Sequence, residues 1–158
     1  MAGKGKIALF LIMAHVLFYT GWAMAHGSVV TLKGMEDPAR VYGDGVKLIA
    51  FQGGGNIKGL GWLLAVTPDG KKAGLVGVAR EETHHGRLVQ ATCMDLERNI
   101  IEVVVLRVME DEKKEVDALI ELPEWWKIAP AQKLSGAALV LRNSVMKVQA
   151  ASGEVVIP

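Results

Sequence analysis

The chain has 158 residues, 51% of them hydrophobic, which is room for one folded domain after an N-terminal targeting segment. Lys4 and Lys6 are the only charged residues among the first 25, so the remainder carries 16 basic and 17 acidic side chains, a net charge of −1. This balance argues against a nucleic-acid partner, because nucleic-acid binding requires a basic surface. The single cysteine, Cys93, excludes an intramolecular disulfide and a CxxC site.

The first 25 residues have the three parts of a secretory signal peptide: a basic start, the apolar run 7–25, and the small residues AMA before His26. Cleavage at that point would give a mature protein that begins with histidine. The run is also 19 residues long, near the length that spans a bilayer, so an uncleaved membrane anchor is the alternative. Both alternatives place residues 26–158 in the periplasm or outside the cell, either free or anchored in the cytoplasmic membrane.

The rest of the chain consists of short apolar runs separated by turn residues, a pattern typical of β-strands. Glycine supplies the positive φ of tight turns, so Asp44-Gly45 and Asp69-Gly70 predict two of them. Residues 100–109 are apolar on both faces except at Glu102 and Arg107, which predicts a central strand. The predicted strands are SVVTLKG, ARVYG, GVKLIAFQ, LGWLLAVTP, AGLVGVARE, RLVQATCMDL, NIIEVVVLRVME, EVDALIEL, AALVLRNSVMKV and EVVI.

No long amphipathic helix is predicted for the body of the chain. The charged stretch EDEKKEVD is expected to form a solvated hairpin loop, and PEWWKIAPAQKL a short helix or an irregular crossing. We therefore predict an all-β fold, an antiparallel β-sandwich of the immunoglobulin-like kind with eight or nine strands. An apolar N-terminal helix would precede this single domain, which would span residues 26–158.

The segment FQGGGNIKGLGW is rich in glycine but does not predict a nucleotide site. A Walker loop needs Gly-Lys-Ser/Thr at the start of a helix, whereas Lys58 is followed by Gly59. A loop between two strands is the simpler interpretation.

Three histidines are candidate metal ligands. His84 and His85 lie together in the polar segment REETHHGRL, and cleavage before His26 would add a free amine beside a third imidazole. Nitrogen ligands in such an arrangement suit Cu(II). In the sequence AHG around the predicted cleavage site, and in its predicted fold, the chain resembles copper-dependent polysaccharide monooxygenases and some periplasmic copper carriers. It departs from the monooxygenases after that point, because HGSVVTLKG lacks their continuation with proline and arginine.

Two other features are candidates for function. Trp125 and Trp126 are adjacent, and we expect one ring to close the end of the core while the other offers a surface to a partner or ligand. Cys93 is expected to be a buried structural thiol. No Ser-His-Asp arrangement and no isolated pair of carboxylates suggests hydrolytic chemistry.

These observations favour an exported, non-enzymatic binding module or accessory subunit of an envelope or membrane-associated complex. Its expected partners are another protein and, through residues 7–25, a membrane. One alternative is a periplasmic copper-binding protein that uses His26 with His84 or His85. Another is a subunit of an extracellular filament, in which the terminal GEVVIP is a strand donated to a neighbouring chain.

Overall fold

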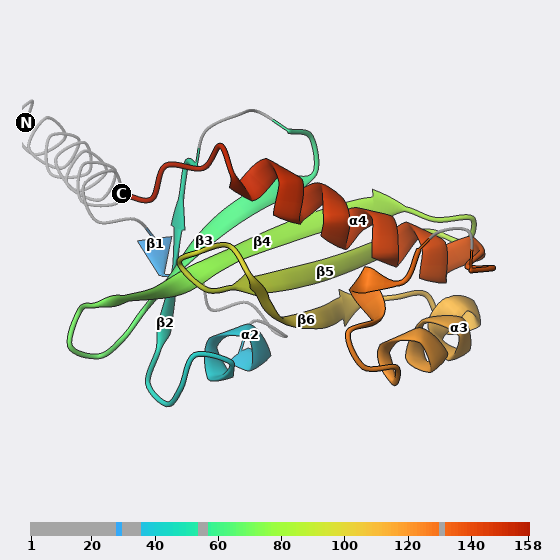
Figure 1. Ribbon diagram of the computed structural model, residues 1–158, viewed down its shortest axis with the longest axis horizontal. Helices are drawn as coiled ribbons and strands as arrows, with labels where there is room; N and C mark the ends of the chain where they lie inside the picture. The colour runs from blue at the N-terminus through green and yellow to red at the C-terminus, as the bar shows by residue number, and fades with distance from the viewer. Residues whose placement is uncertain (1–27, 30–35, 54–56, 130–131) are drawn as a thin grey trace, which may run out of the picture.

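A computed structural model describes residues 28–29, 36–53, 57–129 and 132–158. The five longer strands come first along the chain and the two long helices follow them, as Figure 1 shows. The elements are β1 (Ser28–Val29), α2 (Glu36–Arg40), β2 (Lys47–Phe51), β3 (Leu60–Val66), β4 (Lys72–Glu82), β5 (Arg87–Met94), β6 (Ile100–Arg107), α3 (Glu110–Ile120), η1 (Trp125–Lys127) and α4 (Gly136–Ser152).

The strands form one open antiparallel sheet in which their spatial order equals their order along the chain. β1 contributes only two residues at one edge, where Ser28 lies opposite Ala50 of β2. Five longer strands, β2 to β6, therefore make up most of the sheet, and β6 forms its other edge. Each connection between these five strands is a hairpin, so the sheet is a simple meander.

Helix α4 crosses one face of the sheet over β4 and β5 (Figure 1). Its buried residues lie three or four positions apart, which places them on one stripe of the helix. They are Ala137, Ala138, Leu141, Ser144, Val145, Val148 and Ser152. Helix α3 and η1 pack beside α4 and complete this layer.

The contact between α4 and β4 depends on a residue without a side chain. A Cβ added to Gly77 would overlap Cγ1 of Val148 and lie 2.9 Å from the Trp62 ring. Next to this contact, buried Gln90 donates a hydrogen bond from Nε2 to Ser144 Oγ at 3.2 Å and accepts one from Thr92 Oγ1 at 2.7 Å. Close packing and this buried polar link together fix the position of α4 on the sheet.

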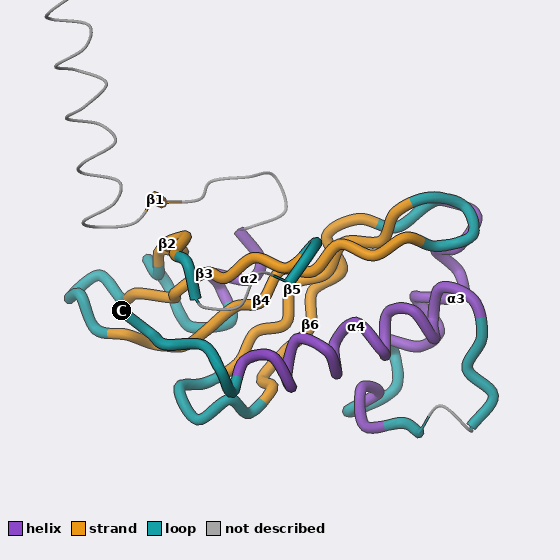
Figure 2. The backbone as a smooth tube through the Cα atoms, turned by 90° about the horizontal axis from the view of Figure 1, so that it is seen from above, coloured by secondary structure: helices purple, strands orange, loops and turns teal. Residues whose placement is uncertain are grey.

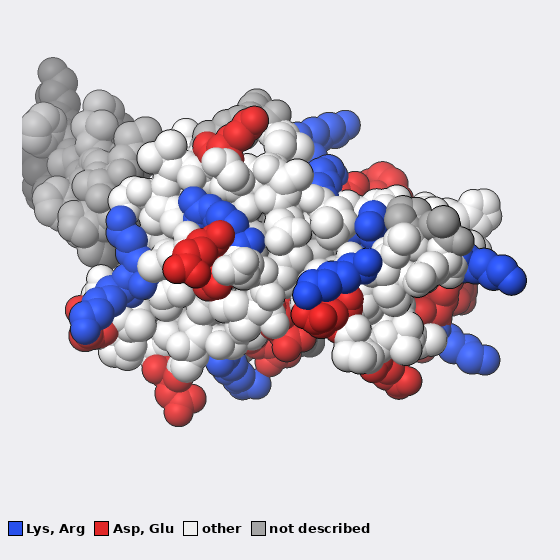
Figure 3. Space-filling view, viewed as in Figure 1, with Lys and Arg blue, Asp and Glu red and all other residues white. Residues whose placement is uncertain are grey.

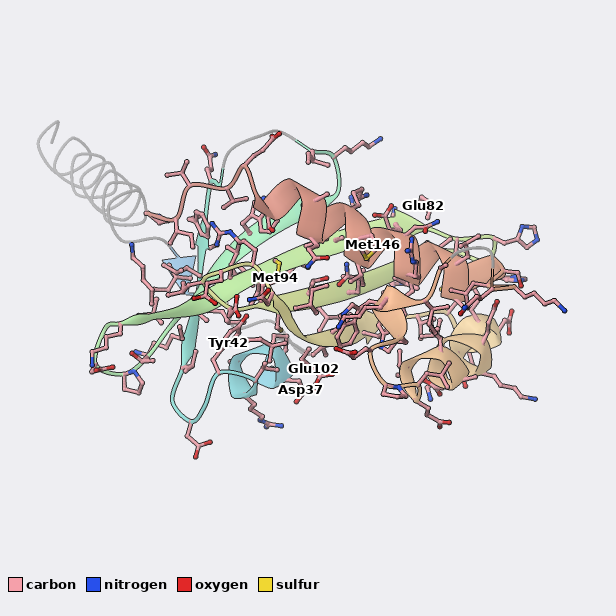
Figure 4. The ribbon with its side chains drawn as sticks, viewed as in Figure 1. Asp37, Tyr42, Glu82, Met94, Glu102 and Met146 are labelled. Carbon is pink, nitrogen blue, oxygen red and sulfur yellow. The ribbon has the colours of Figure 1, made fainter. Side chains whose placement is uncertain are left out.

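The opposite face of the sheet has its own apolar cluster, formed by Leu48, Leu63, Ala65, Val76, Ala91 and Cys93. Helix α2 and the segment that follows it cover part of this cluster, and Figure 2 shows α2 and α4 on opposite sides of the sheet. The Tyr42 hydroxyl is 2.9 Å from the carbonyl oxygen of Met94 and 3.1 Å from that of Leu75, and Figure 4 shows Tyr42 beside Met94. The sheet thus lies between two layers of unequal size.

The predicted all-β, immunoglobulin-like sandwich is wrong. The fold is mixed α/β, with one open sheet packed against the C-terminal helices α3 and α4 instead of against a second sheet. The run AALVLRNSVMKV lies in α4, and EVDALIEL lies largely in α3. Valine and isoleucine made both runs resemble strands, but tertiary packing of an apolar stripe outweighs the weak helix propensity of β-branched residues.

Other predictions of strand position have mixed outcomes. The runs assigned to β2, β3, β4, β5 and β6 are strands, and the turns at Gly45 and Gly70 are confirmed by their φ values of +76° and +83°. The run at residues 100–109 was expected in the centre of the sheet, but β6 is an edge strand. EDEKKEVD is helical, ARVYG includes the end of α2 and a turn, and EVVI begins in the turn after α4 and lies outside the sheet. Of SVVTLKG, only Ser28 and Val29 lie within the described residues.

Replacement of Gly77 by alanine tests the close approach of α4 to β4. The added methyl group must displace Val148 or Trp62, so we expect a loss of about 1–3 kcal/mol in the free energy of unfolding, measured by urea denaturation. Gly61 of β3 is the matched control, because a Cβ there meets no atom within 4 Å. A Gly77→Ala variant as stable as Gly61→Ala would contradict this packing.

Candidate functional site

The two adjacent histidines lie at the tip of the β4–β5 hairpin, where it meets the start of α3. Glu112 of α3 is buried, and its carboxylate accepts hydrogen bonds from Thr83 Oγ1 at 2.7 Å and from the His85 backbone N–H at 3.3 Å. Both oxygens of this carboxylate therefore hold the hairpin tip in place. Glu112 was not expected from the sequence, because only the tertiary fold brings it to a hairpin 27 residues earlier.

The side chains of His84 and His85 are exposed. Their rings make an edge contact with centroids 4.8 Å apart, and Nδ1 of His85 is 3.9 Å from a carboxylate oxygen of Asp111. Within the described residues, no group of three His, Cys, Asp or Glu side chains is arranged to hold a metal ion. The expectation of a metal-binding protein is wrong for this part of the chain, and His26 lies outside it.

Cys93 lies in the core on the face covered by α2. Its Sγ is 4.0 Å from the carbonyl oxygen of Pro38 and is fully buried. Burial raises the pKa of the Cys93 thiol to about 12, and the nearby Glu102 carboxylate acts in the same direction while the Tyr42 hydroxyl opposes it. Because the thiolate is the reactive form, this cysteine is chemically inert near neutral pH.

The C-terminal segment is held against the body by Arg98, in the turn between β5 and β6. Arg98 has a φ of +73°, unusual for a residue with a side chain. Its Nη2 donates to the carbonyl oxygen of Val155 at 3.0 Å, and its own carbonyl accepts a hydrogen bond from Gln149 at 3.4 Å. Val155 is buried beside Trp62, so Arg98 fastens the end of the chain to the core.

The two tryptophans differ in their surroundings. Trp125 is buried, with 4% of its surface exposed, in the cluster between the sheet, α3 and α4. Trp126 is partly buried, packs against that cluster and meets the Trp125 ring in a T-shaped contact at 5.7 Å. Trp126 is the member of the pair that retains exposed surface.

β6 forms one edge of the sheet in the described part of the chain. Among the described residues β6 pairs with β5 alone, so the backbone groups on its other side have no strand partner. Its sequence, IIEVVVLR, is apolar between Glu102 and Arg107, and Ile101 is 44% exposed. The sequence predicted this strand but could not reveal the edge, which depends on the order of strands in the sheet.

The face of the molecule that carries α4 has no dominant charge. Lysine and arginine side chains alternate with aspartate and glutamate across it in Figure 3. None of the helices in the described part of the chain is long and apolar enough to cross a membrane, and the apolar run 7–25 lies outside that part.

The raised pKa of Cys93 predicts a loss of stability in alkali. In the unfolded chain the thiol ionises above pH 9, whereas in the folded protein it stays protonated to about pH 12. The contribution of the protonated thiol to the free energy of unfolding is therefore fully present below pH 9. It falls as the pH rises from 9 to about 12. Between pH 8 and pH 10 we expect wild type to lose about 1 kcal/mol more than Cys93→Ala in urea unfolding. Equal losses in wild type and Cys93→Ala would contradict the prediction, because they would show that the thiol ionises as easily in the folded protein as in the unfolded chain.

Comparisons of the chain with protein families, with curated proteins and with solved structures find no match.

Proposed function

We propose that this protein is an exported, non-enzymatic binding module, an accessory subunit of an envelope or membrane-associated complex, and that it binds a partner protein along the free edge of β6. The basic and apolar N-terminal sequence supports export. The observation that carries the binding role is an eight-residue strand, apolar from Val103 to Leu106, with no described strand partner on one side. An extended segment of another protein would add to this edge as a further strand.

The interactions of the polar groups inside the body support a non-enzymatic role. Glu112 holds the β4–β5 hairpin, Arg98 fastens the C-terminal segment, and Gln90 links the sheet to α4. The Cys93 thiol is buried with a raised pKa. These buried or partly buried groups maintain the fold instead of converging on a cavity where a substrate would bind.

The side chains of β6 suggest what kind of segment would bind there. Val104 and Leu106 lie on the face of the sheet that carries α2, and both retain partial exposure. Glu102 and Arg107, near the two ends of the strand, are exposed. A complementary segment would be extended and apolar in its centre, with a basic residue near Glu102 and an acidic residue near Arg107.

The contacts of the C-terminal segment do not favour the alternative of a filament subunit. That alternative used GEVVIP as a strand donated to a neighbouring chain. Val155 is instead buried in its own chain's core, and the Val156 N–H donates to the carbonyl oxygen of Gly53 at 3.2 Å. Donation would require these contacts to break.

Photo-crosslinking in the producing cells tests the proposed edge. A benzophenone side chain placed at Glu102 or Arg107 should give adducts with a single partner, and sequencing of the crosslinked peptide should identify an extended apolar segment. Leu106→Lys should reduce the adduct yield at least fivefold, because charge on an edge strand opposes further pairing.

The matched control places the same crosslinker and the same lysine substitution on α3. Ile120 is also a partly exposed apolar residue, so Ile120→Lys should leave the β6 adducts unchanged. Adducts that join two copies of this chain, or adducts at α3 without any at β6, would contradict the proposal.

A further inference from the structure

We propose that the last three residues, Val156–Pro158, form a second contact with the membrane beside the N-terminal anchor. This C-terminal tail would insert its apolar side chains into the headgroup region of the bilayer. The inference rests on the anchored form of the proposed function, in which residues 7–25 remain attached and span the membrane.

The sheet brings the tail to the corner where the chain enters the body. Ser28, the first residue of β1, lies opposite Ala50, next to the end of β2. Just after that end, the carbonyl oxygen of Gly53 accepts a hydrogen bond from the Val156 N–H at 3.2 Å. Figure 1 shows the C-terminus on the same side of the molecule as β1 and the end of β2.

The length of chain between the anchor and the sheet keeps this corner close to the bilayer. The apolar run ends at residue 25, and the first strand begins at Ser28. Three residue steps span at most about 11 Å even when fully extended. A retained anchor therefore holds β1, and with it the tail, within this distance of the apolar segment's end.

The tail presents an apolar side chain in a fixed direction. Val155 is buried beside Trp62 and its carbonyl accepts a hydrogen bond from Arg98, whereas the next side chain, Val156, is 78% exposed. Because contacts on both sides already order this backbone, insertion of Val156 would lose little conformational entropy. Ile157 is partly exposed and extends the apolar surface.

The charges beside the tail indicate the kind of lipid surface that fits. Glu154 is exposed and carries a negative charge next to the tail. The Arg98 guanidinium, which donates to the Val155 carbonyl oxygen, carries a positive charge, so these two charges beside the tail balance. A zwitterionic lipid surface suits this corner, because it offers both signs of charge to the two side chains.

A fluorescent probe on the full-length protein tests the contact. Val156→Cys is labelled with the environment-sensitive dye NBD and reconstituted in phosphatidylcholine vesicles that contain a headgroup nitroxide quencher. Buried Cys93 should remain unlabelled, which intact mass verifies. The control is Leu122→Cys, an exposed apolar position just after α3, and Figure 1 shows α3 at the opposite end of the molecule from the C-terminus.

The expected result is a blue-shifted emission at position 156 and quenching at least twofold stronger than at position 122. Vesicle flotation reports separately on the anchor. Protein that floats with equal quenching at both positions overturns the tail contact and leaves the anchor intact. Protein that fails to float overturns both the tail contact and the anchored form of the proposed function.

Discussion

The packing of α4 against β4 and β5 is the contact on which the rest of the structure depends. It requires the absence of a side chain at Gly77, so that Val148 and Trp62 can meet there. The buried hydrogen bond between Gln90 and Ser144 then fixes the position of α4 along its own axis. Once α4 covers this face, α3 and η1 pack beside it, and the tail after α4 reaches the corner near Gly53. A second sheet has no apolar face left to cover there, which explains why the fold is not a sandwich.

Local patterns in the sequence were sufficient to predict the strands β2 to β6 and the turns at Gly45 and Gly70. The two long helices were not predicted, because valines in α4 and isoleucine in α3 suggested strands. The spacing of Ala137, Leu141, Val145 and Val148 is helical and was the signal available for α4. The contacts of Glu112 and the edge position of β6 depend on which distant segments meet, and no local pattern contains that information. His26 and the apolar run lie outside the described residues, so those predictions stay predictions.

The two proposed interaction surfaces lie in separate parts of the protein. Polar groups inside the body hold its elements together, as Glu112 does at the hairpin tip and Arg98 does at the C-terminal segment. The surfaces proposed for interaction are apolar and peripheral. The β6 edge would receive a partner segment, and the corner around Ser28 and Val156, near the opposite edge of the sheet, would lie at the membrane. A tethered module arranged in this way would leave its binding edge accessible to a partner.

The central claim is that the described residues form a single open sheet in which the outer edge of β6 pairs with no other strand. Residue-resolved amide hydrogen exchange of the full-length chain tests it most directly. Consecutive amides in the middle of β4 and β5 should exchange slowly, because both strands have a neighbour on each side. Between Glu102 and Val105 of β6, slow amides should alternate with amides that exchange as fast as those in exposed loops. Uniform protection along this stretch would show that the edge is covered and would contradict the account.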